Sequence, residues 1–219
     1  MLDTMPYSSS GLRKRGRISR FDSLIEFWAD RRGLSLPMLK AQIKQESDFV
    51  QWARNASSGA RGLMQLTDIA IADIERIRQD KESDLDIYPY MMDHGQIGVD
   101  PDLNIAYGSY YFKHRCLAFW PEIPDPVEQV RYALFVYNAG VGHGKMAAQV
   151  ARKSCGQPAE YSKWVAEGSP EGPWQSWHYF KRYIGHKAAS NGKFAKTSEC
   201  IPYVELIEAQ SRKYGGLPF

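Results

Sequence analysis

Apolar residues near the start of the chain recur at the spacing of an amphipathic helix. The first such set stands at positions i, i+3, i+4 and i+7: Phe21, Leu24, Ile25 and Trp28. Two arginines and a glycine follow at residues 31–33, and late positive charge with a C-terminal glycine is typical of a helix end. The pattern therefore predicts a first helix that begins near Phe21 and ends at Gly33.

A second helix carries a carboxylate on its apolar face. It is expected to begin at Ser35, a favourable N-cap residue, with Pro37 in the first turn. At about 100° per residue, four side chains fall within an arc of about 80°: Leu36, Leu39, Ile43 and Glu46. Spacing alone leaves two interpretations of this acid open, a rim residue in contact with water or a functional carboxyl.

Further helices are predicted along the rest of the chain from periodicity and from terminal residues. They cover the segment from Thr67 or Asp68 through Ile77, the segment after Asp102, the segment from Asp125 to Gly140, and a last segment through Tyr203 that stops at residues 215–216. No convincing alternating run and no internal repeat is present. The fold class is therefore mainly α.

Three other segments lack a strong helical pattern. Residues 1–18, rich in Ser, Gly and Arg, are expected to form a flexible basic arm before one domain over residues 19–219. Residues 80–101 are predicted to form a long surface loop. Residues 141–196 are expected to hold a long irregular insert, in which Trp164, Trp174 and Trp177 pack in the core by default and stack on sugars in the alternative interpretation.

Composition limits the classes of protein that fit. With 219 residues, 43% of them hydrophobic, the chain can bury the core of one medium domain. A formal charge of +3 is too mild to indicate a nucleic-acid-binding protein. No run approaches the length of a membrane span, and no apolar segment follows the N-terminal arginines, so neither stable membrane insertion nor a standard signal peptide is expected.

The sequence contains no metal or cofactor motif. Cys116, Cys155 and Cys200 lie far apart and are odd in number, so at most one disulfide bond is expected. The five histidines show no HExxH spacing, and the glycine-rich segment 140–145 lacks the residues of a phosphate-binding loop. We therefore expect neither a metal nor a cofactor.

The remaining chemistry centres on the single carboxyl of the second helix. Burial disfavours the charged form of a carboxyl and raises its pKa, which suits it to donate a proton near neutral pH. A glycine-rich turn follows at residues 59–62, and Tyr137 with Asn138 stands near the end of another helix. Because aromatic faces suit sugar rings, these features point weakly to a carbohydrate substrate.

The order of several short motifs resembles the soluble lytic transglycosylases of bacterial cell walls. The resemblance spans roughly residues 21–214 and rests on four ordered blocks: Glu46-Ser47 followed by Gly59-Ala60-Arg61-Gly62-Leu63-Met64-Gln65; Asp100-Pro101 and Asn104-Ile105 with Gly108 and Tyr111; Tyr137-Asn138-Ala139-Gly140; and Glu199 with Tyr203-Val204. It implies a mostly helical, lysozyme-like catalytic domain.

The resemblance also implies roles for individual residues. Glu46 would be the single catalytic acid and base, Met64 and Gln65 would line the cleft, Tyr137 and Asn138 would position the substrate, and Glu199 would be a second acidic contact near the sugar. Three departures from the family pattern affect hydrogen bonds to the substrate. The segment between Glu46 and Gly59 is one residue longer than in the family pattern. The family's cleft serine is therefore represented by Asn55 or Ser57, or it is absent. In addition, Val136 stands in place of an alanine and Cys200 in place of a threonine.

The implied reaction cleaves the β-1,4 bond between N-acetylmuramic acid and N-acetylglucosamine and leaves a 1,6-anhydromuramyl end. Glu46 would protonate the leaving oxygen and then take the proton of the muramyl C6 hydroxyl. One carboxyl is sufficient because the nucleophile is already tethered to the sugar. A hydrolase would normally need a second acid.

Three alternatives remain from the sequence. A lysozyme-type muramidase would use water, assisted by Glu199 or Asp93; a non-catalytic virion or glycan-binding protein would keep only the fold; and a nucleic-acid-binding protein would use the arginines between Arg13 and Arg20. The expected partner is the peptidoglycan glycan strand, not nucleic acid, and we expect a monomer. The site of action would be the periplasmic or extracellular cell wall. Because no leader is recognised, we expect the protein to reach the wall as a phage endolysin or as a virion-associated enzyme.

Overall fold

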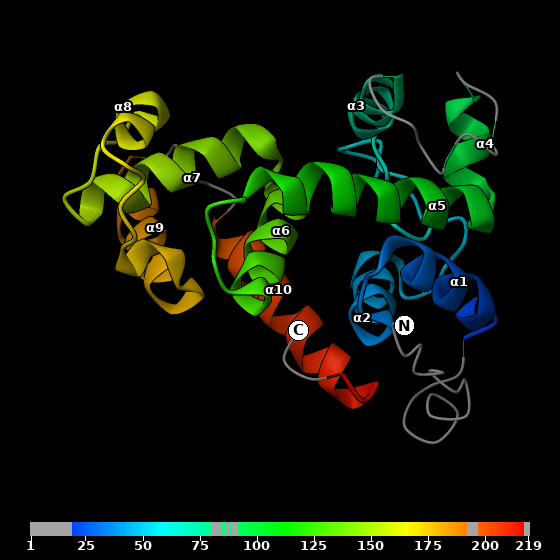
Figure 1. Cartoon of the computed structure of the whole chain (residues 1–219). Helices are drawn as coiled ribbons and strands as arrows, with labels where there is room; N and C mark the ends of the chain where they lie inside the picture. The colour runs from blue at the N-terminus through cyan, green and yellow to red at the C-terminus, as the bar shows by residue number, and fades with distance from the viewer. Residues whose placement is uncertain (1–18, 80–84, 86–87, 89–91, 192–196, 217–219) are drawn as a thin grey trace, which may run out of the picture.

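The computed structural model describes residues 19–79, 85, 88, 92–191 and 197–216, so the predicted arm over residues 1–18 lies outside the described part. Helices dominate the described residues, and isolated bridges between Arg54, Arg61 and Leu66 stand in place of strands (Figure 1). This confirms a mainly α fold. The helices are α1 (Asp22–Arg32), α2 (Leu36–Ser47), α3 (Asp68–Gln79), α4 (His94–Val99), α5 (Pro101–Tyr111), α6 (Pro126–Ala139), α7 (Val141–Ser154), α8 (Tyr161–Ala166), α9 (Trp177–Asn191) and α10 (Thr197–Lys213).

The ends of the first two helices follow the predicted local chemistry. Gly33 ends α1 in the left-handed conformation, with φ at 61°, which a glycine adopts without steric cost. The Ser35 side chain accepts a hydrogen bond from the Met38 amide at the start of α2. Asp48 ends α2 at a φ of 52°, so the chain turns sharply just after Glu46. Local sequence thus places Glu46 in the last turn of a buried helix.

Two buried clusters meet at helix α2. One contains Leu39 and Ile43 of α2 with residues of α1, α3 and α5, and the other contains Met38 and Ala41 with residues of α6, α7, α9 and α10. Figure 1 shows α1, α3 and α4 on one side of the molecule, α7, α8 and α9 on the other, and α6 with α10 between them. The end of α2 therefore lies where the two halves of the core join.

Two segments are more regular than the sequence pattern predicts. The expected loop over residues 80–101 contains α4, which Asp93 caps by accepting from the Gln96 amide, and α5 begins at Pro101 rather than after Asp102. The segment 141–196 contains α7, α8 and α9. Helix α7 begins directly after Gly140, and its small residues pack closely: a β-carbon on Gly144 would come within 2.7 Å of Val136. Gly140 was predicted to end a helix, and the glycines at residues 142 and 144 have low helix propensity, so a helix that begins directly after Gly140 was not predicted.

The tryptophans of this segment belong to the core. Trp164, Trp174 and Trp177 are buried, as the default interpretation predicted. The Arg152 guanidinium lies over the rings of Trp164 and Trp174, 5.4 Å and 5.5 Å from their centroids. These rings stabilise the packing of α7 on α8 and are not available for sugar stacking.

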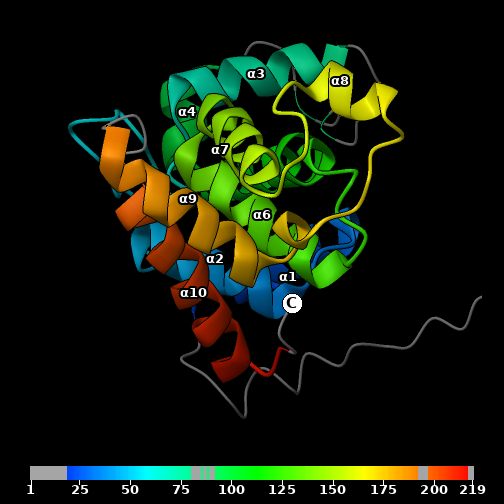
Figure 2. The same ribbon diagram turned by 90° about the vertical axis from the view of Figure 1, so that its left-hand side faces the viewer.

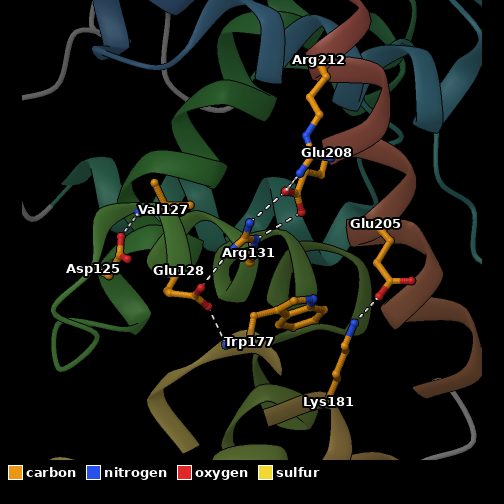
Figure 3. A network of polar contacts seen from close by, with 9 residues as sticks. All are labelled: Asp125, Val127, Glu128, Arg131, Trp177, Lys181, Glu205, Glu208 and Arg212. Atoms are coloured by element: carbon orange, nitrogen blue, oxygen red, sulfur yellow. Dashed lines mark hydrogen bonds and ion pairs between the residues drawn. The ribbon is translucent and has the colours of Figure 1, made fainter. Parts of the chain in front are cut away.

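A polar network fixes the position of α10 against α6 and α9. Arg131 of α6 donates two hydrogen bonds to Glu208 of α10, at 3.2 Å and 2.8 Å, and one to Glu128 at 2.7 Å (Figure 3). Glu128 also accepts from the Trp177 amide at the start of α9. Figure 2 shows α9 and α10 side by side on the face that this network joins. Among the described helices, none is both long and apolar enough to cross a bilayer.

Candidate active site

Glu46 of α2 is held by a tyrosine from the last helix. Helix α10 packs along α2, and the Tyr203 hydroxyl donates to Glu46 Oε1 at 2.5 Å. Lys40 of α2 is buried, pairs with Asp22 at 2.8 Å and lies 5.0 Å from the ring centroid of Tyr214. The Tyr203–Glu46 and Tyr214–Lys40 contacts hold α2 against the last helix at two points, so the Glu46 carboxyl has a defined orientation.

The environment of Glu46 favours its protonated form. Burial raises the pKa of Glu46 to about 7, because a charged carboxylate loses hydration there. The hydrogen bond from Tyr203 lowers this pKa and offsets only part of the effect of burial. A carboxyl with a pKa near 7 can both donate and accept a proton at neutral pH.

Tyr137 joins α6 to the glycine-rich turn beside Glu46. Its hydroxyl donates to the Met64 carbonyl oxygen at 2.8 Å, and its ring meets the Tyr111 ring edge-on with 5.7 Å between centroids. Burial first, and the Glu46 carboxylate second, raise the pKa of Tyr137 well above its ordinary value. The Tyr137 hydroxyl therefore remains a hydrogen-bond donor at any physiological pH.

The turn over residues 59–66 owes its shape to an asparagine of α5. Asn104 donates to the carbonyl oxygens of Arg61 and Ile97 and accepts from the Met64 amide at 2.7 Å. Gly62 has a φ of 79°, and a β-carbon there would come within 2.4 Å of Asn104 Nδ2. No side chain fits this position, which explains the glycine in the motif.

Gln65 sits in an unusual backbone conformation at the end of this turn. Its φ is 49°, in the left-handed region that non-glycine residues rarely adopt. Its side-chain amide donates to the carbonyl oxygens of Ala53 at 3.2 Å and Gly62 at 2.9 Å. Such conformations cluster at functional sites, where surrounding contacts maintain them.

A cavity of about 700 Å³ opens beside these residues. Gln65, Tyr137 and Asn138 line it. Glu46 is half-buried and lies beside Tyr137 without being part of the cavity wall. The Met64 side chain is wholly buried, and a β-carbon on Gly108 would meet its sulfur at 2.4 Å, so Met64 offers its carbonyl oxygen to Tyr137 rather than a side chain to the cavity.

The other predicted site residues lie at the surface. Glu199 is exposed in the first turn of α10, one helical turn before Tyr203 and so on nearly the same face. Asn55 and Ser57 are exposed in one turn, where the Asn55 side chain accepts from the Ser57 amide at 3.0 Å and from the Ser57 hydroxyl at 2.7 Å. Both are therefore engaged in local turn hydrogen bonds.

Of the acids that might assist a water nucleophile, Glu199 is exposed at the start of α10, and three others are engaged elsewhere. Asp48 ends α2 and pairs with Lys44, and Asp93 caps α4. Asp73 of α3 lines the cavity, but its carboxylate pairs with Arg115 at 2.6 Å and Arg76 at 2.5 Å. Glu46, beside Tyr137, has no ion pair with any of the described residues.

Two residues of the site were not assigned roles from sequence. Tyr203 was part of a motif but had no predicted partner, since 157 positions separate it from Glu46. Gln42 lies one turn before Glu46 on the same face of α2, is fully buried, and contacts the Tyr203 hydroxyl. A polar residue one turn from the acid on an apolar face was the available signal.

The described residues contain no group of histidine, cysteine or acidic side chains able to hold a metal ion. Cys116, Cys155 and Cys200 are all free thiols.

The arrangement of helices and the placement of one glutamate between two tyrosines define a lysozyme-like domain. A solved structure with the same fold is that of an inactive mutant of the lytic transglycosylase Slt from Pseudomonas aeruginosa. The two share a TM-score of 0.57 and 21% sequence identity, over 90% of this chain and 24% of that one. At this identity the likeness concerns the fold alone.

The family follows from the sequence comparison. The family model of the transglycosylase SLT domain matches residues 23–157, which is more than half of the chain. The chain therefore belongs to this family. Two relatives are named membrane-bound lytic murein transglycosylase F. The one from Desulfosudis oleivorans is 28% identical over 87% of this chain and 35% of its own length, and the one from Maricaulis maris is 29% identical over 64% of this chain and 26% of its own. This chain thus spans about a third or less of the relatives' length.

Proposed function

We propose that this chain is a peptidoglycan lytic transglycosylase. It cleaves the β-1,4 bond between N-acetylmuramic acid and N-acetylglucosamine and forms a 1,6-anhydromuramyl end. The observation that carries the proposal is a single half-buried glutamate with a pKa raised to about 7, held by Tyr203 and lying beside Tyr137, which lines a cavity of about 700 Å³. Membership of the SLT family and the names of the two relatives support the same substrate class.

In the proposed reaction Glu46 acts twice. Protonated Glu46 donates to the glycosidic oxygen as the bond from that oxygen to the muramyl C1 breaks, and the substrate's N-acetyl group or an oxocarbenium ion carries the positive charge. The Glu46 carboxylate then removes the proton of the C6 hydroxyl as its oxygen bonds to C1. The proton balance closes on one carboxyl, and no water is consumed.

The neighbouring residues orient the acid and the sugar. The Tyr203 hydroxyl stabilises the carboxylate formed after the first proton transfer. Tyr137 and Asn138 position the sugar, with Tyr137 also holding the Met64 carbonyl oxygen in place. Gln65 also lines the cavity, and Glu199 at the start of α10 supplies a further acidic contact to the glycan. The partner is the glycan strand of the bacterial wall, bound by a monomer in the periplasm or outside the cell.

Glu46→Gln tests the proposal directly. The amide keeps the shape of the side chain but cannot donate and recover a proton, so digestion of purified sacculi should fall by about 10²–10⁴-fold while glycan binding persists. Glu167→Gln, at an exposed glutamate after α8, is the matched control and should digest sacculi like the wild type. Digestion by Glu46→Gln within about tenfold of the wild type would remove Glu46 from the mechanism.

A further inference from the structure

A second cavity lies at the end of the molecule where α7 and α8 meet (Figure 1). It has a volume of about 510 Å³ and is bordered by the 3₁₀ turn Leu117–Phe119, the segment before α6, helix α7 and the first residue of α8. Of the described residues, Arg115 alone lines both this cavity and the one beside Tyr137. The second cavity is therefore a separate space, and the proposed reaction does not use it.

Arg152 of α7 lines this cavity and is deeply buried. It is 3% exposed, and its guanidinium lies over the rings of Tyr161, Trp164 and Trp174, at 5.8 Å, 5.4 Å and 5.5 Å from their centroids. Nη2 donates to the Ala159 carbonyl oxygen at 3.1 Å, whereas the buried Nε has no hydrogen-bond partner among the described residues. A buried charged donor without an acceptor is costly, so the guanidinium still lacks a partner.

Glu122, the acid of this cavity, also has an unsatisfied atom. Its backbone carbonyl oxygen accepts from the Gln175 side-chain amide at 2.8 Å, which fixes the position of the residue. Its carboxyl Oε2 is buried and has no hydrogen-bond partner in the described part of the chain. Burial raises the pKa of Glu122 by more than its backbone hydrogen bond and the charge of Arg152 lower it. The carboxyl therefore lacks the positive partner that would stabilise its charged form.

The two charges share the cavity without pairing. Glu122 and Arg152 are close enough for each to affect the pKa of the other, yet no ion pair joins them within the described structure. Opposite charges that are buried together gain most from direct contact, because each then compensates the lost hydration of the other. Lys145, exposed at the edge of the same cavity, adds a second positive charge. The cavity thus presents one negative and two positive groups to whatever enters it.

A zwitterion with an apolar body matches these groups. An α-amino acid carries its ammonium and carboxylate groups on one carbon, so the two can reach opposite charges across a small gap. Guanidinium groups bind carboxylates through charge-assisted hydrogen bonds, and a carboxylate binds an ammonium group in the same way. Phe119, Pro121 and Tyr161 line the cavity and supply apolar surface for a side chain. The volume is in the range of small-molecule sites, and a neutral sugar would leave the charges unpaired.

We propose that this cavity binds a free α-amino acid with an apolar side chain. The carboxylate of the ligand pairs with Arg152 and Lys145, its ammonium group pairs with Glu122, and its side chain lies against Phe119 and Pro121. The site goes beyond the proposed cleavage of the glycan and does not depend on it.

Three probes of similar shape test the match of charges. They are L-phenylalanine, 3-phenylpropanoate, which lacks the ammonium group, and 2-phenylethylamine, which lacks the carboxylate. Each is titrated calorimetrically into the wild-type protein at pH 7 and low salt. We expect phenylalanine to bind about tenfold more tightly than either of the others, because it alone satisfies both charges of the cavity.

Two variants assign the binding to this cavity. Glu122→Gln should lower the affinity for phenylalanine to about that for 3-phenylpropanoate, and should not weaken 3-phenylpropanoate. Lys145→Gln should weaken both carboxylate probes by about two- to fivefold, as expected for an exposed charge. Because Lys145 is exposed, this variant keeps the test decisive if Glu122→Gln fails to fold. Glu167→Gln, at an exposed glutamate after α8 that does not line the cavity, is the matched control and should change no affinity.

Equal affinity for the three probes would overturn the proposal, because the cavity would then select a ring and not a zwitterion. The absence of saturable heat with phenylalanine, or an affinity for phenylalanine that Glu122→Gln and Lys145→Gln leave unchanged, would overturn it as well. These titrations involve no glycan. A protein that leaves sacculi intact would therefore overturn the proposed function and would not alter the comparison of the three probes.

Discussion

The raised pKa of Glu46 predicts that the acid costs stability above neutral pH. In the folded protein this pKa rises from 4.5 to about 7, whereas an unfolded chain restores the ordinary value. Between these values the folded state binds more protons than the unfolded state, so the free energy of unfolding falls as the pH rises. Glu46→Gln removes the titration and should therefore stabilise the protein above pH 7.

The magnitude follows from the two pKa values. A difference of one pKa unit corresponds to about 1.4 kcal/mol, so the full penalty of an ionised Glu46 is about 3 kcal/mol. This penalty should be almost complete at pH 8, above both pKa values, and only about 1 kcal/mol at pH 5, because pH 5 lies just above the pKa of 4.5 in the unfolded chain. Relative to the wild type, Glu46→Gln should thus gain about 2 kcal/mol between pH 5 and pH 8.

Urea denaturation at pH 5 and pH 8 measures this gain, since the linear extrapolation gives the free energy of unfolding at each pH. The matched control is again Glu167→Gln, whose exposed carboxyl should give no such gain. A stability difference between Glu46→Gln and the wild type that stays the same at both pH values would refute the reasoning. The Glu46 pKa would then be close to that of an exposed glutamate.

Three further variants separate the neighbours of Glu46 from the core. Tyr203→Phe removes a hydrogen bond that lowers the pKa of Glu46. The alkaline limb of the pH–activity profile should therefore move up by about 1–2 pH units. An unmoved limb would mean that this hydrogen bond does not affect the pKa of Glu46. Tyr137→Phe should reduce turnover on sacculi substantially with little change in melting temperature, and normal turnover would make Tyr137 a packing residue only. Trp164→Ala should lower the free energy of unfolding, measured in urea, by about 3–5 kcal/mol and leave the glycan affinity per folded molecule unchanged. A loss of glycan affinity at unchanged stability would mean that the Trp164 ring binds sugar.

Local signals in the sequence were sufficient to predict the helix ends near the site and the position of Glu46 on α2. Ser35 and Asp125 cap α2 and α6 as their types predict, and the apolar stripe of α2 places Glu46 toward the core. These features depend on neighbours within one or two helical turns, so a pattern along the chain contains them. The same holds for the glycine that ends α1.

Contacts between distant segments were beyond the sequence pattern. The motif suggested that Met64 lines the cleft, yet its side chain is buried because Gly108 of α5 leaves room for it. The partnership of Tyr203 with Glu46 depends on how α10 lies on α2, which the Arg131–Glu208 pair and the packed core decide. Periodicity within one element carries no information about such pairings.

The identity of the new sugar end tests the central claim most directly. Sacculi digested by the wild type in water labelled with heavy oxygen, followed by mass spectrometry of the released muropeptides, distinguish attack by the C6 hydroxyl from attack by water. The account predicts 1,6-anhydromuramyl ends without label, because Glu46 serves both proton transfers and the neighbouring acid Asp73 is held by two arginines. Reducing ends that carry heavy oxygen in most muropeptides would contradict it and would identify the protein as a hydrolase.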